Sequence, residues 1–267
     1  MGSNEAPLSY SLPLEGRVAI ITGASRGIGS EISLHLASLG AKVVLSYTSE
    51  SSAELTDLLA SKINASSPPS YPRAITHQAN VSDPIQVKLL FDRAEEAFQT
   101  QPHIVVNSAG VLDAKYPAIA NTSVEDFDNT FSVNTRGAFL VSREAANRLK
   151  RGGGGRIILL SSSTVGSLRI GHGAYAASKA AIETMVKILA KELKGMQITV
   201  NCVAPGPIAT QMFFEGKTED QVTKTIEECP LGRLGEIEDV APVIGFLAGD
   251  SSGWINGQTI RVNGGYV

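Results

Sequence analysis

The stretch Arg17-Val-Ala-Ile-Ile-Thr22, followed directly by Gly23-Ala-Ser-Arg-Gly27-Ile-Gly29, decides the fold. Its first part is apolar and rich in β-branched residues, which is typical of a buried strand. After the glycines, apolar residues recur at helical spacing up to a glycine that can end a helix: Ile28, Ile32, Leu36, Leu39 and Gly40. A glycine turn between a strand and a helix lets a pyrophosphate approach the backbone and face the helix N-terminus. A bare glycine turn is the alternative, but this placement favours nucleotide binding.

The rest of the chain alternates strands and helices, the pattern of a mostly parallel sheet covered on both faces. The further predicted strands are Lys42–Tyr47, Arg73–Gln78, His103–Asn107, Arg156–Ser161, Ile198–Val203 and Thr259–Val262. Asp83-Pro84 predicts the start of a helix through Phe98, and a long helix is expected from Val124 to Leu149. Residues 66–70, rich in Ser and Pro, predict a surface connection. The pattern indicates one doubly wound α/β domain with its ligand beyond the carboxyl ends of the strands.

Composition narrows the class of protein. With 267 residues and a net charge of −3, the chain has no basic footprint for nucleic acid or for an acidic membrane. No apolar run approaches the ~20 residues that cross a bilayer. Cys202 and Cys229 lie far apart and lack metal-like spacing, so we expect a reducing compartment and no metal site. Residues 1–16 lack a secretory signal and, being short and free of Arg, do not resemble a plastid presequence, so we expect a cytoplasmic location.

Tyr175-Ala-Ala-Ser-Lys179 places a phenol and an ammonium on one helical face, because residues four apart are neighbours on a helix. An unperturbed phenol titrates near about 10, which is too weakly acidic for proton exchange at neutral pH. A fixed cation favours the phenolate and lowers that pKa, which would make Tyr175 a general acid or base. Many surface helices carry a Tyr and a Lys at this spacing by chance. The pair therefore indicates a catalytic role only in combination with the glycine turn.

Taken together, the motifs resemble the short-chain dehydrogenase/reductase family. In family order they are Thr22-Gly-Ala-Ser-Arg-Gly-Ile-Gly29, Asn107-Ser-Ala-Gly110, Asn134, Ser163, Tyr175 with Lys179, and Pro205-Gly206. They extend from the first strand to beyond the sixth, with high combined specificity. Ser108 departs from the second Asn that is common in the family. Within the family the chain is most similar to NADPH-dependent carbonyl reductases, a group that includes 3-oxoacyl-carrier-protein reductases, fungal hydroxynaphthalene reductases and plant aldehyde/ketone reductases.

The resemblance implies a single Rossmann-type domain over residues 17–267 with a seven-stranded sheet, an N-terminal extension over 1–16 and a substrate lid over 206–235. It also implies a homo-oligomer, a tetramer or a dimer, in which the long helix and the Tyr175 helix pack across an interface. The Tyr175 helix carries an apolar stripe, which can equally face its own sheet: Ile182, Met185, Val186, Leu189 and Leu193.

The resemblance further implies the chemistry. A hydride passes from the cofactor to a carbonyl carbon while Tyr175 gives its proton to the developing alkoxide. Ser163 would hydrogen-bond the carbonyl oxygen, Asn134 would hold a water that links Lys179 to solvent, and Lys179 would also bind the nicotinamide ribose. Ser162 is the second choice for the catalytic serine, because the neighbouring hydroxyls differ by only one residue in their separation from Tyr175.

The charge after the second strand points to the cofactor. NAD-selective sites commonly carry an acidic residue there, but here the strand ends in Ser46-Tyr47-Thr48-Ser49 with no carboxylate before Glu50. Hydroxyl groups can bond to a 2′-phosphate that an acid would repel, and Arg26 can supply a bidentate cation. Alternatively, Arg26 is a solvated loop side chain and Ser46 only ends a strand. We expect NADP(H).

The resemblance adds further contacts, with Asn80 near adenine and Pro205-Gly206 beside the nicotinamide. The complete expected cofactor set is Gly23, Ser25, Arg26, Gly27, Ile28, Gly29, Ser46, Tyr47, Thr48, Ser49, Asn80, Val81, Asn107, Ala109, Gly110, Tyr175, Lys179, Pro205, Gly206, Ile208 and Thr210.

The substrate is expected to be a small apolar or aromatic aldehyde or ketone, because Met212, Phe213 and Phe214 precede a helix-like segment over 218–228 in the lid. These side chains can equally be core or interface residues. Leu168, Arg169 and His172 are candidates for the pocket mouth. The first candidate function is an NADPH-dependent reductase of aldehydes or ketones. The alternatives of the same fold are an alcohol dehydrogenase that works oxidatively with NAD(P) and a 3-oxoacyl-carrier-protein reductase. A further alternative is a dinucleotide-binding protein without catalytic activity.

Overall fold

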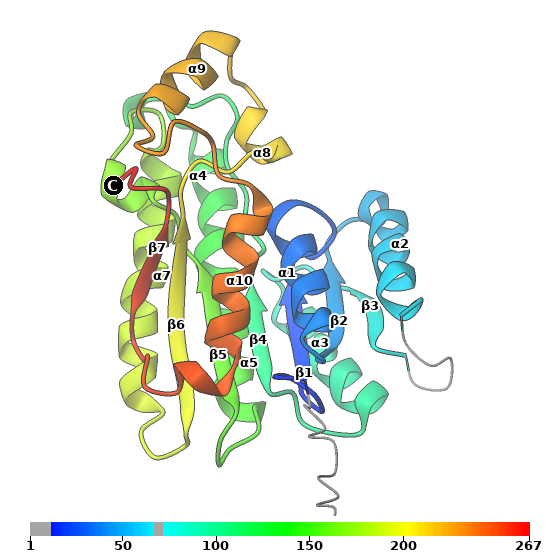
Figure 1. The fold of residues 1–267 in the computed structure, drawn as a ribbon. Helices are drawn as coiled ribbons and strands as arrows, with labels where there is room; N and C mark the ends of the chain where they lie inside the picture. Colours follow the sequence, from blue (N-terminus) through cyan, green and yellow to red (C-terminus); the bar gives the residue numbers. More distant parts are fainter. Residues whose placement is uncertain (1–11, 67–71) are drawn as a thin grey trace, which may run out of the picture.

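The computed structural model describes residues 12–66 and 72–267, and Figure 1 shows how the elements are arranged. Residues 67–70 of the predicted connection and residues 1–11 of the predicted N-terminal extension lie outside the described residues. Seven strands form one sheet in the order β3-β2-β1-β4-β5-β6-β7, and every neighbouring pair is parallel. Their bounds are β1 Val18–Thr22, β2 Lys42–Tyr47, β3 Ala74–Gln78, β4 Ile104–Asn107, β5 Gly155–Leu160, β6 Ile198–Pro205 and β7 Thr259–Val262.

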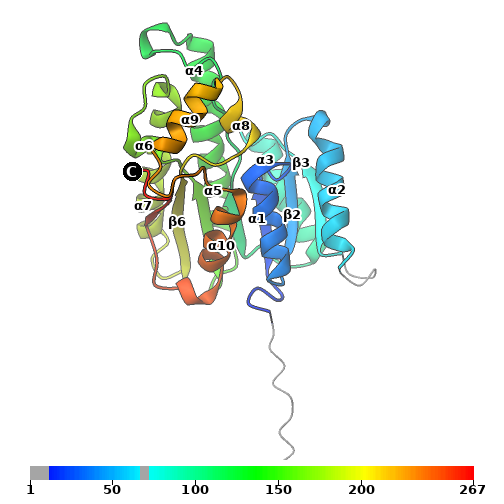
Figure 2. The same cartoon turned by 45° about the horizontal axis from the view of Figure 1, so that its top comes forward.

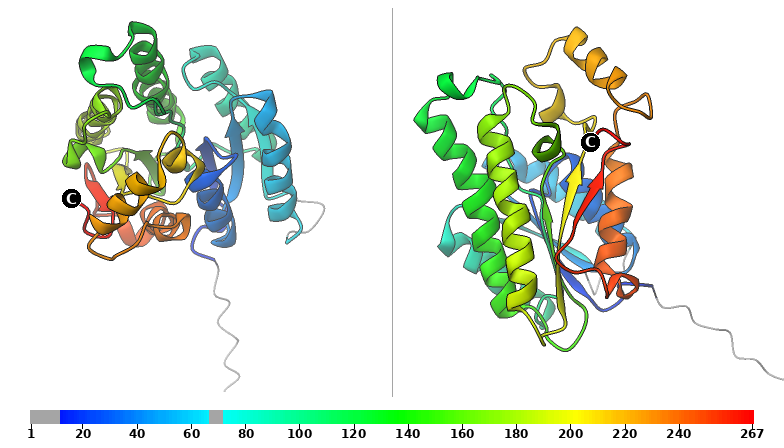
Figure 3. Two further views of the ribbon diagram at one scale, coloured as in Figure 1. Left: turned by 90° about the horizontal axis from the view of Figure 1, so that it is seen from above. Right: turned by 90° about the vertical axis from the view of Figure 1, so that its left-hand side faces the viewer.

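Helices cover both faces of this sheet, as the right-hand view of Figure 3 shows. One apolar core joins the sheet to α3 (Pro84–Phe98), α5 (Gly137–Arg148) and α7 (Gly173–Glu192). The other joins it to α1 (Gly27–Ser38), α2 (Ala53–Asn64) and α10 (Ile237–Ala248). The strands are buried on both faces, which explains why they read as continuous apolar runs rather than alternating ones. The remaining helices are α4 Val124–Phe131, α6 Thr164–Ser167, α8 Gln211–Phe214 and α9 Glu219–Glu227.

The sequence predictions of the strands and of most helices are confirmed. The Asp83 carboxylate accepts from the Ile85 and Gln86 backbone N–H groups at 2.8 and 3.3 Å, so it caps α3 as predicted. The long predicted helix is interrupted: a π-helical turn over Ser132–Arg136 separates α4 from α5. The apolar stripe on α7 packs against its own sheet, since its members belong to the first core or touch it.

Residues 12–16, which the sequence placed in the extension, take part in the fold. Leu14 is fully buried in the second core. Its backbone N–H donates to the Leu39 carbonyl at 2.8 Å. The folded unit therefore begins before Arg17.

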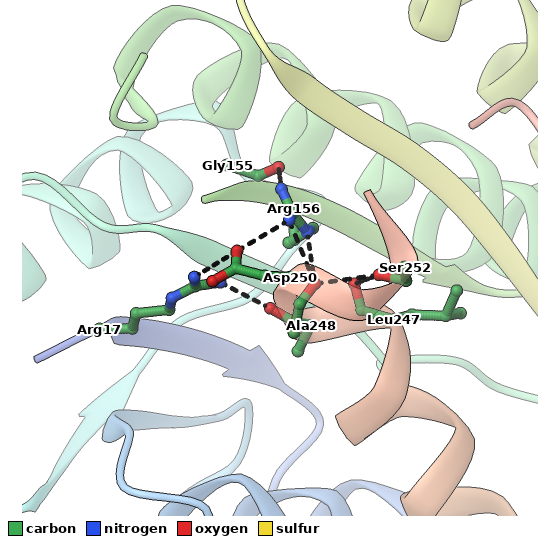
Figure 4. Close-up of polar contacts among 8 residues, drawn as sticks. Arg17, Gly155, Arg156, Leu247, Ala248, Asp250 and Ser252 are labelled. Atoms are coloured by element: carbon green, nitrogen blue, oxygen red, sulfur yellow. Dashed lines mark hydrogen bonds and ion pairs between the residues drawn. The ribbon is translucent and has the colours of Figure 1, made fainter. Parts of the chain in front are cut away.

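Two guanidinium groups and one carboxylate tie together elements at the edge of the sheet opposite the strand carboxyl ends (Figure 4). Arg17, just before β1, donates to Asp250 Oδ1 at 2.6 Å and to the Ala248 carbonyl at 3.0 Å. The buried Arg156 of β5 donates to the Gly249 carbonyl at 3.2 and 3.1 Å and lies 3.4 Å from Asp250 Oδ1. These contacts connect the end of α10 to two strands.

We expect Asp250→Ala to destabilise the fold by about 1 kcal/mol, a modest value because the carboxylate is largely exposed and screened. The hydrogen bond from Arg17 lowers the pKa of Asp250, so the stabilisation is present above the unfolded pKa of about 3.9 and is lost as pH falls through the lower folded value. Thermal unfolding of both proteins at about pH 6 and pH 3 measures this. The exposed Asp128, replaced by Ala, is the control and should not lower the unfolding temperature. An Asp250 effect that is no smaller at about pH 3 than at about pH 6 would contradict this interpretation.

Candidate active site

A cleft of about 500 Å³ opens at the carboxyl ends of the central strands, below α8 and α9, which lie forward in Figure 2. Its volume is in the range of cofactor and small-molecule sites. Its position at the carboxyl edge of the sheet agrees with the prediction. Of the predicted cofactor residues, those that line it are Gly23, Ser25, Arg26, Gly27, Ile28, Gly29, Tyr47, Thr48, Ser49, Asn80, Ala109, Gly110, Tyr175, Lys179, Pro205, Gly206, Ile208 and Thr210.

The glycine turn between β1 and α1 forms one end of the cleft. Gly23 has φ +65° and lies so close to the next loop that a Cβ would stand 2.8 Å from the Ala109 Cα. A Cβ on Gly29 would overlap the Gly23 carbonyl oxygen. Glycine is therefore required at both positions for this tight turn. The turn leads the N-terminus of a twelve-residue helix into the cleft, an arrangement that suits a pyrophosphate.

The end of β2 differs in part from the prediction. Ser46 is buried, and its hydroxyl has no hydrogen-bond partner among the described residues and does not reach the cleft. The hydroxyls that line this end belong to Thr48, Ser49 and Ser52. Ser46 is therefore corrected to a core position, because it points into the layer under the strand end. Arg26 is exposed at the cleft, where no ion pair engages it within the described chain.

Two other predicted cofactor contacts lie inside the protein. Asn107 is buried, and its Oδ1 accepts from the Thr22 hydroxyl at 2.8 Å. The same hydroxyl accepts from the Ala109 backbone N–H at 3.2 Å, so Asn107 and Thr22 hold the end of β4 against β1. Val81 is buried in the first core. The predictions that these two side chains contact the cofactor directly are corrected, since both are buried and neither lines the cleft.

Tyr175 and Lys179 meet at the centre of the cleft, near the N-terminus of α7. Lys179 Nζ donates to the Leu160 carbonyl at the end of β5 at 2.8 Å and lies 5.8 Å from the centroid of the Tyr175 ring. Burial lowers the pKa of Lys179 to about 8. Burial raises the pKa of Tyr175 above its ordinary value, and this effect exceeds the opposing hydrogen bond with Ser162. The predicted lowering of the Tyr175 pKa is therefore not present in the structure, because desolvation of the phenol dominates.

Ser162, rather than Ser163, is the serine that faces Tyr175. Its side chain lies close enough to the Tyr175 phenol to lower the pKa of that phenol, and its hydroxyl accepts from the Thr164 backbone N–H at 3.2 Å. Ser163 is buried, donates to the Ala204 carbonyl at 3.2 Å and accepts from the Asn263 amide at 3.1 Å. The prediction of Ser163 as the catalytic serine is corrected to Ser162, the alternative from the sequence. The Ser163 hydroxyl is instead hydrogen-bonded to β6 and to the C-terminal segment.

Asn134 lies in the π-helical turn and is fully buried. Its Oδ1 accepts from the Val111 backbone N–H at 2.8 Å, and its Nδ2 donates to the Val111 carbonyl at 2.9 Å and to Ser178 Oγ at 3.0 Å. A Cβ on the adjacent Gly110 would stand 3.2 Å from Asn134 Oδ1 and 3.3 Å from Lys179 Nζ. Asn134 thus does not line the cleft but holds the strand-end loop beside the Lys179 amine.

The other end of the cleft is formed by α8, the segment after it and the C-terminus. Of the side chains predicted for the lid and the mouth, Met212, Phe213, Arg169 and His172 line it. Phe214 and Leu168 do not, and both are exposed. Lys217 and Tyr266 line it too, although sequence reasoning did not place them there. Neither belongs to a periodic pattern or motif, so the sequence carried no signal for them.

The charge of the cleft is one-sided. Among the residues that the structure describes, no Asp or Glu lines it, whereas four basic side chains do: Arg26, Arg169, Lys179 and Lys217. In a chain of net charge −3, this local excess favours anionic ligands. The described parts of the chain hold no cluster of three His, Cys, Asp or Glu side chains arranged to bind a metal. They also contain no helix with the length and apolarity needed to cross a membrane.

The chain is similar to known proteins over nearly its whole length. A family model described as Enoyl-(Acyl carrier protein) reductase matches residues 23–267. A protein of Arabidopsis thaliana named NADPH-dependent aldehyde reductase-like protein, chloroplastic, is 66% identical over 261 residues, which cover 96% of each chain. NADPH-dependent aldehyde reductase 2, chloroplastic, of the same plant is 53% identical over 269 residues, or 99% of each chain.

A solved structure, that of a short chain dehydrogenase from Burkholderia cenocepacia J2315 in complex with NADP, has a TM-score of 0.86 and 34% identity and covers 95% of this chain and 99% of that chain. Both Arabidopsis relatives are named chloroplastic, which contradicts the cytoplasmic location expected from the sequence. With the family match over 23–267 and these relatives along nearly its whole length, this chain belongs to the short-chain dehydrogenase/reductase family.

Proposed function

We propose that this protein reduces the carbonyl group of an aldehyde or ketone to an alcohol with NADPH as the hydride donor. The observation that carries the proposal is that one cleft joins a glycine turn shaped for a pyrophosphate to the Tyr175 phenol, beside which lie Ser162 and the Lys179 amine. The relatives named NADPH-dependent aldehyde reductases support both the cofactor and the reaction, and their chloroplastic names support a plastid location.

The residues of the cleft fit NADPH at both ends. The glycine turn and the N-terminus of α1 receive the pyrophosphate, and Arg26 with the hydroxyls of Thr48 and Ser49 receives the 2′-phosphate. No carboxylate of the described chain lines that end to repel the phosphate or to select for NADH. When bound, NADPH supplies the hydride.

The protein supplies the proton and the electrostatic environment. Tyr175 gives its hydroxyl proton to the developing alkoxide as general acid. Ser162 is placed beside that hydroxyl to hydrogen-bond the carbonyl oxygen as charge develops on it. The Lys179 amine, whose pKa is about 8, is still mostly protonated at neutral pH and stabilises the phenolate that Tyr175 leaves behind. Asn134 holds the loop of Gly110 and Val111, which passes beside the Lys179 amine, and its role in holding a water stays a prediction.

Arg26→Ala tests the cofactor assignment. We expect it to raise the KM for NADPH by about 10–100-fold, because a charge-assisted pair with the 2′-phosphate is lost. NADH lacks that phosphate and serves as the internal control, so its KM should change little. Steady-state rates with both cofactors over a panel of aldehydes and ketones measure this. Equal losses for both cofactors would refute the phosphate contact, and tight NADPH binding without turnover of any carbonyl would favour a non-catalytic binding protein.

We also infer that residues 206–235 act as the substrate lid, since several of them line the cleft.

We further infer that the chain associates with copies of itself. Large apolar side chains on adjoining helices stay exposed in the single chain, with Phe139 of α5 at 48% and Ile188 of α7 at 51% exposure. Burial of such side chains between subunits would be favourable. Light scattering should give a mass of two or four chains, and a monomer would contradict the inference.

A further inference from the structure

Lys217 is held firmly at the wall of the cleft, in the segment that connects α8 to α9. Its Nζ donates to the Tyr116 hydroxyl at 2.5 Å and to the Phe213 carbonyl at 2.6 Å. The ammonium also lies over both rings, 4.4 Å from the Tyr116 centroid and 4.6 Å from that of Phe213. A Cβ on the preceding Gly216 would overlap the Ala114 carbonyl oxygen, so the backbone here packs closely on the neighbouring loop. The position of Lys217 is therefore set by the fold.

This ammonium has no carboxylate partner. None of the ion pairs within the described residues includes Lys217. Burial and the nearby Arg169 cation lower the pKa of Lys217 to about 8. An ammonium has three N–H donors, and the two neutral oxygens leave one of them free. A partly buried cation without a counter-anion is costly unless something else supplies the negative charge.

The missing charge is best supplied from the cleft, because Lys217 lines it together with the proton donor. Tyr116, which accepts from Lys217, lies near enough to Tyr175 to affect the pKa of its phenol, and its ring contacts that of His172 with 5.0 Å between centroids. The Lys217 ammonium and the catalytic phenol thus line the same cleft. The contacts of Lys217 are with this loop and α8, not with the glycine turn that fits the pyrophosphate.

We propose that Lys217 selects carbonyl substrates that carry a carboxylate, by binding that group while Tyr175 protonates the carbonyl oxygen. The proposal rests on the proposed function. It refines the expected apolar or aromatic substrate, since the ammonium is surrounded by aromatic rings and a flat aldehyde acid would contact both. Arg169 adds to the positive potential, although Glu228 already pairs with it at 3.1 Å. The net charge of −3 would repel anions, so a preference for them must arise locally.

The test compares 4-carboxybenzaldehyde with its neutral methyl ester, methyl 4-formylbenzoate, as NADPH-dependent substrates. We expect kcat/KM of the unmodified protein to be about tenfold higher for the acid than for the ester. One charge-assisted hydrogen bond in a partly solvent-exposed site contributes about this factor. Lys217→Met, which keeps the stem but not the charge, should abolish the preference by lowering kcat/KM for the acid. An unfolding temperature close to that of the unmodified protein shows that the variant folds. Lys217→Arg should retain the preference. Lys115→Met is the matched control, because Lys115 is exposed, pairs with Asp126 at 2.6 Å and does not line the cleft.

A preference for the ester in the unmodified protein, or an acid preference that survives Lys217→Met, would overturn the proposal. So would a Lys217→Met variant whose only defect is a higher KM for NADPH, since Lys217 would then serve the cofactor. Calorimetric binding of 4-(hydroxymethyl)benzoate to the protein with NADP needs no turnover. Binding that Lys217→Met weakens about tenfold supports the anion site even if carbonyl reduction itself were refuted. Equal binding to both proteins refutes the anion site alone.

Discussion

Tyr175→Phe is expected to lower kcat by about a thousandfold, within the range that general acid catalysis contributes. Phenylalanine keeps the ring that packs near the Lys179 amine but removes the hydroxyl that donates the proton. Lys179 keeps its own hydrogen bond to the Leu160 carbonyl, so the cofactor end of the cleft is left in place. Steady-state turnover and the fluorescence of bound NADPH measure the two effects separately.

The same variant should bind NADPH nearly as tightly as the unmodified protein and unfold at nearly the same temperature. These two controls show that a loss of kcat comes from the missing proton. Turnover that stays within about tenfold of the unmodified rate would reject Tyr175 as the proton donor. A loss of NADPH binding equal to the loss of kcat would instead make the phenol a cofactor ligand.

Ser162→Ala and Ser163→Ala are expected to separate catalysis from stability at adjacent positions. Ser162→Ala should lower kcat by about a hundredfold, the usual cost of one donor to the developing oxyanion, because its hydroxyl faces Tyr175. Ser163→Ala should leave kcat nearly unchanged but lower the unfolding temperature by about 2–6 °C, since the half-buried Asn263 amide and the buried Ala204 carbonyl lose a partner. Each variant is the control for the other. The reverse assignment, with kcat lost in Ser163→Ala alone, would restore the prediction from the sequence.

Most of the fold could be predicted from the sequence, because the strands are buried on both faces and read as unbroken apolar runs between helices. The bounds of β2 and β7 agree with the prediction, and Asp83 caps α3 as expected. The π-helical turn around Asn134 could not be predicted, since it lies within one helical run and Gly137, which follows it, fits an uninterrupted helix equally well. The sequence showed a helix there, and only the three-dimensional packing shows that Asn134 faces Val111.

Site residues could be predicted where their role depends on spacing along the sequence. They could not be predicted where the role depends on the side to which a side chain points or on the path of a loop. Gly23, Gly29, Tyr175 and Lys179 follow from motifs on regular elements. Ser162 and Ser163 follow a strand end, where adjacent side chains point to different sides, so a single-residue choice was needed and the spacing did not provide it. Lys217 reaches the cleft only through the path of the segment after α8, and such loop paths leave no periodic signal.

The raised pKa of Tyr175 shows the same limit for electrostatics. Spacing placed the Lys179 cation beside the phenol, but the degree of burial of both groups depends on the whole site. Desolvation raises the pKa of the phenol and lowers the pKa of the amine, because burial disfavours the charged form of each group.

The central claim is that this cleft transfers a hydride from NADPH to a carbonyl carbon. NADPH deuterated on the transferred position of C4 tests it directly, with 4-carboxybenzaldehyde as acceptor and mass spectrometry of the alcohol as the readout. We expect one deuterium on the new carbinol carbon for each NADPH consumed, and a rate of label transfer about a thousandfold lower in Tyr175→Phe. Alcohol formed without the label, or NADPH consumed without any labelled alcohol, would contradict it.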